Sequence, residues 1–555
     1  MNKKMYLPLA ITGALVFSSC NKKMGEMDPN FFNVAPQTLV AVGGQVPATI
    51  DGTFPEKYFT KKSIVTVTPV LVYEGGETKG TPFTYQGEKV EGNDQSISYK
   101  MGGNISMKTS FKYIPQMRDS ELYLDFDVET GSRVYELPRV KVADGVIATS
   151  EMASAANAVP AIAPDGFERI TTEDYMAKIL FLIQQANVRS SQLTTAEMDK
   201  VKEMMSQAEE AENQRVSEFN IMSTASPDGG MELNTRLASN RELNTVKYME
   251  RMLSKEEIET EIFAEFTPED WAGFKELVEK SNIQDKKLIL DVLAMYNNPD
   301  EREAQIKNLS AAFTQLADEI LPQLRFSKVT ATIETVGKSD EEISTLVKSN
   351  PSELNVEEML YAATLTSNVK EQAAIYKETI KYFPNDFRAY NNLGRIEFEA
   401  GNIAEASKMF DKAASLSPNA PEVAMNEGLV ALSKENFSEA QALFGKAAGA
   451  PELPEALGTL YTERGEYSKA VNAFGETKSN NAAVAQICAG DYNTAKNTLS
   501  AIENKDAHTY YLMAVVGART NNEAMVKSNL EKAISMDPAL ANYAKTDIEF
   551  AKYSM

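Results

Sequence analysis

Histidine and cysteine are almost missing from this chain. Its 555 residues include one histidine, His508, and two cysteines, Cys20 and Cys488. These numbers leave almost no room for a zinc site of cysteine and histidine, a nucleophile–histidine triad or a disulfide framework. A site built from carboxylates alone stays open, but no spacing of Asp and Glu indicates one. We therefore expect a protein that is not an enzyme, with no cofactor and no metal.

A surplus of positive charge is missing as well. The chain has 79 acidic and 56 basic side chains, which gives a net charge of −23. A nucleic-acid-binding surface needs clustered Lys and Arg, so nucleic acid is not an expected partner. The length predicts roughly three or four domains of about 150 residues each. A hydrophobic content of 43% is enough to give them ordinary cores.

The first twenty residues have the layout of a secretory signal. Lys3 and Lys4 precede an apolar run, residues 7–17, that is too short to span a bilayer, and two serines stand before Cys20. The sequence VFSSC resembles the bacterial lipoprotein box, which implies cleavage of residues 1–20 and acylation of Cys20, for example with palmitate. The alternative is a plain secretory signal. We expect a lipid anchor on the periplasmic face of the outer membrane, while the surface-exposed face stays open.

A polar tether, residues 21–36, leads to a region with the two-residue period of half-buried strands. Residues 105–113 and 122–128 alternate between apolar and polar side chains. Glycine-rich turn clusters recur about every ten residues, which is typical of a β-sandwich. We predict an all-β sandwich domain over residues 37–151. Residues 152–168 contain the run ASAANAVPAIAPD, whose small residues and prolines predict a linker.

Residues 169–350 alternate between strand and helix patterns, which predicts an α+β domain. The strands are expected at 179–183, 219–223 and 325–336. The helices are expected at 195–211, with Thr195 as N-cap, and at 234–253, with Leu237, Val246 and Met249 inward.

An insertion of helices is predicted at about 254–323 within this domain. Three stripes of apolar residues at helical spacing indicate the helices. Thr267 is expected to cap the first of them, with Pro268 at the first helical position. The single tryptophan, Trp271, is expected in their core.

The spacing around the second helix resembles that of the OmpA-like cell-wall-binding domain. The matching positions are Gly229, Asn234, Leu237, Arg241 and Tyr248. The inserted helices resemble a variant of this domain in cell-envelope proteins of Bacteroides-like bacteria, in keeping with Bacteroidota envelope lipoproteins.

The family binds the diaminopimelate of peptidoglycan with an Asp and an Arg, since a zwitterion needs an anion and a fork of donors. The resemblance implies Asn234, Arg241 and Asp228 as candidate peptidoglycan-binding residues. The Asp position itself is occupied by Ser226. A modified wall-binding site and a retained framework, in which Arg241 is an ordinary surface charge, both stay open.

Residues 355–555 contain an internal repeat that predicts an all-α solenoid. Gly394 and Gly428 are 34 residues apart, the period of tetratricopeptide repeats. Two successive units resemble that family at these positions: Tyr390, Leu393, Gly394, Ala406, Phe410, Ala413, Pro418, Gly428, Ala440, Phe444 and Ala447.

Stacked helix pairs of this kind form a concave groove that binds extended peptides or partner proteins. Asn392 and Asn426 occupy equivalent positions in successive units, and Arg388 and Arg395 lie nearby in sequence. These four residues are candidates for contacts with a peptide backbone or carboxylate, or they are solvated polar groups.

Together these patterns predict a multidomain, non-enzymatic outer-membrane lipoprotein. The first hypothesis is a scaffold or assembly factor that binds envelope proteins in its tetratricopeptide groove. The alternative is a protein that tethers the membrane to peptidoglycan through a degenerate OmpA-like site. The sequence names neither the partner, the envelope process nor the oligomeric state.

Overall fold

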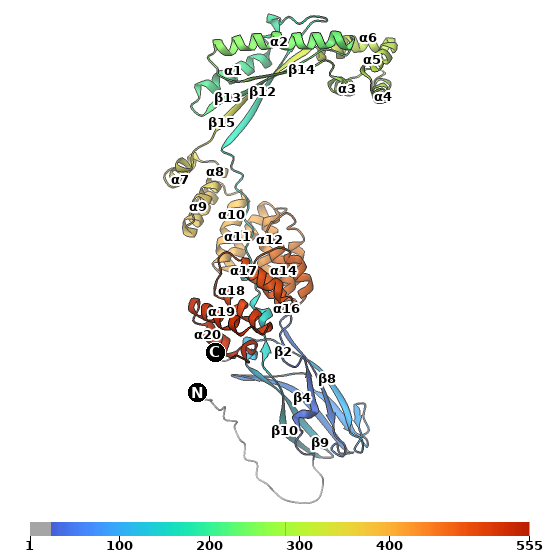
Figure 1. Ribbon diagram of the computed structural model, residues 1–555, viewed down its shortest axis with the longest axis vertical. Coiled ribbons are helices and arrows are strands. Elements are labelled where there is room, and N and C mark those ends of the chain that lie inside the picture. The colour runs from blue at the N-terminus through green and yellow to red at the C-terminus, as the bar shows by residue number, and fades with distance from the viewer. Residues whose placement is uncertain (1–23, 284, 554–555) are drawn as a thin grey trace, which may run out of the picture. The chain divides into compact units, whose positions relative to one another are not determined.

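The computed structural model describes residues 24–283 and 285–553, apart from the side chains of residues 310–312 (Figure 1). Cys20 lies outside these residues. The chain divides into two compact units. Unit 1 joins the described residues up to Asp165 to the helices that follow Thr366, and unit 2 is Gly166–Leu365. The predicted start of the repeat domain at 355 precedes this division, because α8 (Val356–Ala362) belongs to unit 2.

The N-terminal part of unit 1 contains two principal antiparallel sheets around one core. One sheet has the order β1-β3-β8, with strands Phe32–Ala35, Gln45–Phe54 and Gly103–Lys112. The other has the order β10-β9-β4-β6-β7, with β5 (Gly76–Lys79) beside β4. Its strands are β10 (Arg133–Asp144), β9 (Ser120–Thr130), β4 (Ser63–Tyr73), β6 (Phe83–Gly87) and β7 (Gln95–Ile97). Only β6 and β7 pair in parallel within it.

The core of this region uses the alternate residues that the two-residue period predicts. Ile50 and Phe111 come from one sheet and Val67 and Leu124 from the other, and all four are buried in the same cluster. Because successive side chains of a strand point to opposite faces, each strand presents one apolar face to this cluster. A short parallel pair, β2 (Leu39–Val40) with β11 (Val146–Ile147), completes the region.

The C-terminal part of unit 1 is an array of helix pairs, which confirms the predicted repeats. In each of three units a first-helix glycine lies against a second-helix phenylalanine: a Cβ at Gly394, Gly428 or Gly458 would fall inside contact distance of the next phenylalanine ring. The helices are α9 (Val369–Tyr382), α10 (Phe387–Glu399), α11 (Ile403–Leu416), α12 (Pro421–Ser433), α13 (Phe437–Phe444), α14 (Leu453–Glu463), α15 (Tyr467–Phe474), α16 (Asn480–Cys488), α17 (Tyr492–Ala501), α18 (Ala507–Arg519), α19 (Glu523–Met536) and α20 (Leu540–Thr546).

Polar contacts join the β-rich region to the end of the array. The Arg118 guanidinium donates to the Thr546 hydroxyl at 2.9 Å and lies 3.5 Å from the centroid of the Tyr543 ring. The Thr149 hydroxyl donates to the Glu549 carboxylate at 2.7 Å. These contacts explain why the two regions form one compact unit.

Unit 2 contains a four-stranded sheet in the order β12-β15-β13-β14. The strands are β12 (Ile170–Leu180), β13 (Gln214–Thr224), β14 (Ile262–Thr267) and β15 (Phe326–Val336). Helices α1 (Ala196–Glu210) and α2 (Met231–Lys255) bury apolar residues in the cluster that also contains strand residues. Both helices therefore cover one face of the sheet. Thr195 caps α1 as predicted, by accepting from the Met198 amide.

The structure corrects three expectations for this unit. The strand predicted at 179–183 is β12, which begins earlier because it pairs with β15 along its whole length. The predicted helical insertion contains a strand, β14, which pairs in parallel with β13. Its first helix begins at Trp271, because Thr267 ends β14 and the Asp270 carboxylate caps the helix by accepting from the Gly273 amide at 2.7 Å.

The rest of the insertion is helical, as the apolar stripes predict. It consists of α3 (Trp271–Lys280), α4 (Lys286–Met295), α5 (Pro299–Asn308) and α6 (Ser310–Gln315), followed by two short turns up to Leu324. Trp271 is only partly buried and packs against the shared core of these helices. After β15, α7 (Asp340–Ser349) leads to α8.

Candidate functional site: the face of the array that holds residues 153–165

Residues 153–165, which we call the segment, lie against the first helices of four successive repeats. The sequence predicts a linker here, whereas the structure packs the segment on the array. Three of its alanines, Ala155, Ala158 and Ala161, are buried in one cluster with array residues. The segment is visible in Figure 1 as the thin cyan trace beside the orange helices. We call the array residues that bond to it the segment-binding face: Arg388, Asn391, Asn392, Asn426, Glu463 and Asn481.

Three asparagines, Asn426, Asn392 and Asn481, each hold both backbone groups of one segment residue. Asn426 accepts from the Ala161 amide at 2.7 Å and donates to the Ala161 carbonyl at 2.8 Å. Asn392 does the same for Ala163, at 2.8 and 2.9 Å. A carboxamide has one acceptor oxygen and a donor NH₂ group, so it satisfies a peptide unit as a neighbouring β-strand would. Because Ala161 and Ala163 are two residues apart, the 34-residue repeat of the array matches the two-residue period of an extended chain.

The remaining contacts show that the segment runs antiparallel to the order of the repeats: its first residues contact later repeats, and its last residue contacts the first helix of the series. Asn481 of α16 bonds both backbone groups of Ser154, at 3.0 and 3.2 Å. The carboxylate of Glu463, in α14, accepts from the Ala155 amide at 3.0 Å. At the other end, Arg388 of α10 donates to the Asp165 carbonyl at 2.6 Å. The array therefore holds the segment at both ends and in the middle.

The segment-binding face recognises small side chains as well as backbone. Ala161 is 0% exposed and Ala163 is 1% exposed, so both side chains are enclosed and a larger one would have to displace array residues. Between and before them, Ile162 is 41% exposed and Val159 is 53% exposed. Pro160, directly before Ala161, is buried as well. The face thus encloses Pro160, Ala161 and Ala163 and leaves Ile162 free.

The asparagines of this face also bond to one another. Asn391 donates to the Ala161 carbonyl at 3.1 Å, and its own side-chain oxygen accepts from Asn426 at 2.9 Å. Asn391, Asn392 and Asn426 are all buried. Buried polar groups are costly unless they are paired, and the segment backbone supplies these asparagines with partners where it covers them from water.

Buried carboxylates accompany the network. Burial raises the pKa of Glu463 to about 7, although the bond from the Ala155 amide opposes that shift. Burial likewise raises the pKa of Glu455, in the same helix, to about 7, and the Ser479 hydroxyl donates to it at 2.7 Å.

The structure places the four predicted peptide-groove residues unevenly. Asn392, Asn426 and Arg388 contact an extended backbone, which is supplied by this chain itself. Arg395 instead pairs with Glu399 at 2.9 Å, one helical turn away, and bonds to no segment residue. Sequence reasoning missed Asn391, Glu463 and Asn481. Asn391 precedes the repeat-equivalent position, but Asn481 occupies it: Asn481 lies as far before Ala495 as Asn392 lies before Ala406, so the repeat spacing could have found it.

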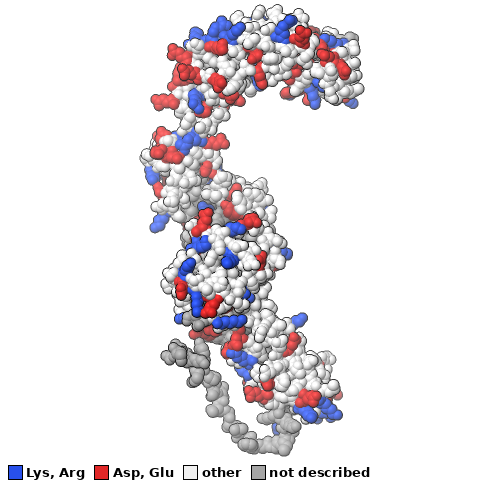
Figure 2. Space-filling model, in the orientation of Figure 1, with Lys and Arg blue, Asp and Glu red and all other residues white. Residues whose placement is uncertain are grey.

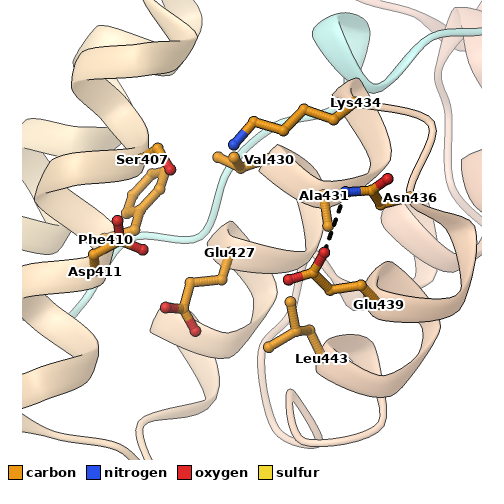
Figure 3. Close-up of a pocket in the computed structure, with 10 residues that line it drawn as sticks. All are labelled: Ser407, Phe410, Asp411, Glu427, Val430, Ala431, Lys434, Asn436, Glu439 and Leu443. Carbon is orange, nitrogen blue, oxygen red and sulfur yellow. Dashed lines mark hydrogen bonds between the residues drawn. The ribbon is translucent and has the colours of Figure 1, made fainter.

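A separate hollow of about 340 Å³ lies between α11, α12 and α13 (Figure 3). Its lining brings Asp411, Glu427 and Glu439 beside Lys434. Burial and the neighbouring Asp411 raise the pKa of Glu427. Asn436 donates to Glu439 at 3.3 Å. This acidic hollow shares no residue with the segment-binding face.

In unit 2 the predicted wall-binding arginine is part of the interior. Arg241 is 1% exposed and donates to the carbonyls of Thr224 at 2.8 Å, Gln185 at 3.0 Å and Leu182 at 3.4 Å. Burial lowers its pKa to about 10. The expectation of a helix-surface charge is therefore wrong. Of the residues of α2 expected to face inward, Met249 is buried and Val246 packs against the core, whereas Leu237 is only half-buried. The buried side chains of α2 are Asn234, Ala238, Arg241, Thr245, Met249 and Leu253.

The other two candidate wall-binding residues are also bonded within unit 2. Asp228 pairs with Arg325 at 3.0 Å. Asn234 donates to the Gly229 carbonyl at 2.6 Å and to the Glu269 carboxylate at 2.8 Å. None of these bonds joins Arg241 to Asp228, although the Asp228 charge is near enough to oppose the fall in the pKa of Arg241.

Comparison with known proteins identifies the array. The family model described as "Tetratricopeptide repeat" matches residues 371–421. No curated protein sequence matches the chain. Among solved structures, a tetratricopeptide repeat protein from Parabacteroides merdae is 16% identical, with 38% of this chain and 91% of that chain covered and a TM-score of 0.30.

Two further solved structures are similar over a comparable length. YrrB, described as a TPR protein with an unusual peptide-binding site, is 24% identical over 31% of this chain and 98% of its own, with a TM-score of 0.24. PilW, described as a type IV pilus biogenesis factor, is 16% identical over 36% of this chain and 94% of its own, with a TM-score of 0.28. TM-scores of this size carry no conclusion about function. The family match and the helix pairs make the array one of the tetratricopeptide type.

Among the residues that the structure describes, neither a metal-binding cluster nor a membrane-spanning helix is found. No group of three or more His, Cys, Asp or Glu side chains there is arranged to hold a metal ion. No helix in the described ranges has the length and hydropathy needed to cross a membrane.

Proposed function

We propose that this chain is a non-enzymatic scaffold of a bacterial outer membrane, which holds extended polypeptides on its tetratricopeptide array. The observation that carries the proposal is the bidentate contact of Asn392 and Asn426 with an extended backbone. Contacts of this kind use only groups that every peptide has, so the array is built to hold polypeptide. On the face drawn in Figure 2, acidic and basic side chains are interspersed, which suits protein partners better than a polyanion.

Crosslinking in the native envelope tests the scaffold. The variant N392A/N426A removes both bidentate contacts. N402A is the matched control, because Asn402 is exposed and its side chain donates to Glu397 and not to the segment. We expect partner proteins to be crosslinked by the wild type and by N402A and to be lost from N392A/N426A. An identical set of partners for all three proteins would contradict a role of this face.

The proposed membrane attachment rests on the sequence VFSSC and the acylation of Cys20 that it implies. We expect Cys20→Ala to move the protein from the membrane fraction to the soluble fraction. Lys22→Ala is a suitable control, because it changes the same stretch and keeps the thiol. Retention of Cys20→Ala in the membrane would contradict the lipid anchor.

We infer that unit 2 keeps an OmpA-like framework without the ligand pair. The strand–helix–strand–helix order and the positions of Gly229, Asn234 and Arg241 support this inference. Peptidoglycan tethering, the alternative hypothesis, would require Arg241 to leave three carbonyl acceptors for an external carboxylate. We therefore favour the scaffold.

A further inference from the structure

We propose that the segment-binding face also binds an extended peptide of a partner protein, with small residues at alternate positions. The segment competes with that peptide for the face. This inference rests on the proposed scaffold function and names its ligand. The occupant is another protein's extended, alanine-like stretch, which replaces residues 153–165 on α10, α12 and α14.

The first support is that the contacts do not depend on the identity of the segment. Within the segment, Asn391, Asn392 and Asn426 bond to backbone amides and carbonyls of Ala161 and Ala163 and to no side chain. A second extended chain presents the same groups at the same two-residue spacing. Nothing in these bonds requires the peptide to belong to this molecule.

The second support is the selectivity that the buried positions impose. The side chains of Ala161 and Ala163 are enclosed by the array, whereas Ile162 has 41% of its surface exposed. A ligand must therefore have Ala, Gly or Ser at two positions separated by one unrestricted residue. Peptides with Leu at the two restricted positions would lose the contacts of the asparagines, since the backbone could not approach them.

The third support is that the segment is tethered and so competes at a high local concentration. Short flexible tethers give effective concentrations in the millimolar range. A free peptide at micromolar concentration is therefore excluded until the segment is weakened or the peptide is presented at high density. Weakening the binding of the segment leaves the face empty in a larger fraction of the molecules. The apparent affinity for a free peptide therefore rises, at most to the affinity that a permanently empty face would have.

Fluorescence anisotropy with the purified full chain tests this competition. The probe is a labelled synthetic peptide with the sequence of residues 153–165. The variant A161D/A163D weakens the segment, I162D is the matched control at the exposed position, and A161D/A163D/N392A/N426A also removes the binding asparagines. We expect the peptide to bind A161D/A163D at least tenfold more tightly than it binds the wild type or I162D. The quadruple variant should lose this gain.

Equal peptide affinity of A161D/A163D and I162D would overturn the inference, provided that circular dichroism shows an intact array. If A161D/A163D does not fold, hydrogen–deuterium exchange of the wild type tests whether a free peptide displaces the segment. A saturating concentration of peptide should then speed exchange of the Ala161 and Ala163 amides. Unchanged exchange would overturn the inference. As a check on selectivity, a peptide with Leu at the positions of Ala161 and Ala163 should not bind.

Failure of this inference differs from failure of the proposed function. If the peptide does not bind but envelope proteins are still crosslinked through the array, the scaffold stands and the segment is a permanent part of the fold. If the peptide binds but no envelope protein is crosslinked, the selectivity of the face stands and the scaffold does not.

Discussion

Replacement of Asn426 by alanine tests the central contact of the segment-binding face. The substitution removes the acceptor of the Ala161 amide and the donor to the side-chain oxygen of Asn391. The Ala161 carbonyl keeps its second donor, Asn391. The loss is therefore confined to two buried groups.

The magnitude follows from the burial of these groups. Ala161 and Asn426 are both 0% exposed, so water does not replace the lost partner of the amide. An unsatisfied buried donor costs about 1–3 kcal/mol, and a lost neutral hydrogen bond costs about 1 kcal/mol more. Together they give about 2–4 kcal/mol, which corresponds to roughly a 30- to 1,000-fold increase in transient release of the segment.

Hydrogen–deuterium exchange measures that release directly. We expect exchange of residues 158–163 to accelerate by this factor in Asn426→Ala, while helices α18 and α19, at the far end of the array, keep their protection. Asn402→Ala, at an exposed asparagine of the same array, should leave exchange of the segment unchanged. If Asn426→Ala and Asn402→Ala exchange at the same rate, the bidentate contact does not hold the segment and the reasoning is refuted.

Three further substitutions test other parts of the structure. Arg241→Ala removes a donor from the carbonyls of Thr224, Gln185 and Leu182, of which the Leu182 carbonyl still accepts from the Gln185 amide. It should destabilise unit 2 by about 1–3 kcal/mol in urea unfolding, whereas the exposed Arg236→Ala should not. A folded Arg241→Ala that only loses binding to peptidoglycan sacculi would contradict this. Gly428→Ala should cost about 1–3 kcal/mol in thermal unfolding, because its Cβ would meet the Phe444 ring. An unchanged melting temperature would show that the ring moves aside freely. Glu455, whose pKa is raised to about 7 in the folded state, stabilises the fold fully below pH of about 4.5, and this contribution of about 3 kcal/mol is lost as the pH rises through 7. Glu455→Gln should flatten the pH dependence of unfolding in that window, and an unchanged profile would refute the assignment.

The repeats could be predicted because their signal is local. Gly394 and Gly428 must be glycine for the helices of a pair to approach, and Phe410 and Phe444 fill the space beside them. Each such unit repeats the same packing problem, so its solution recurs at the same spacing in the sequence. The same repetition placed Asn392 and Asn426 at equivalent positions.

The β-rich region could be predicted for a similar reason. Strands that bury one face must alternate apolar and polar residues, and β8 and β9 do so along their length. In unit 2, by contrast, β14 lies within a stretch that is otherwise helical by pattern. Its strand conformation depends on backbone pairing with β13, a partner some forty positions earlier in the chain.

Arg241 shows how a resemblance in sequence can leave a role undecided. Its position in the OmpA-like spacing is preserved, and the sequence does not tell a ligand-binding arginine from a structural one. In the tertiary structure the guanidinium is held from two places in the fold: by the carbonyls of Leu182 and Gln185 in the loop after β12, and by the carbonyl of Thr224 at the end of β13.

The sequence by itself determined the helical repeats, the β-rich region and the asparagines able to bond a backbone. Only the tertiary structure decided what those asparagines bond. Residues 153–165 have the composition of a linker, and their hydrogen-bonding groups are the amides and carbonyls common to all residues. A contact made through such groups leaves no mark in the sequence of the ligand beyond the small size of Ala161 and Ala163. The occupied face therefore became visible only when the chain was folded.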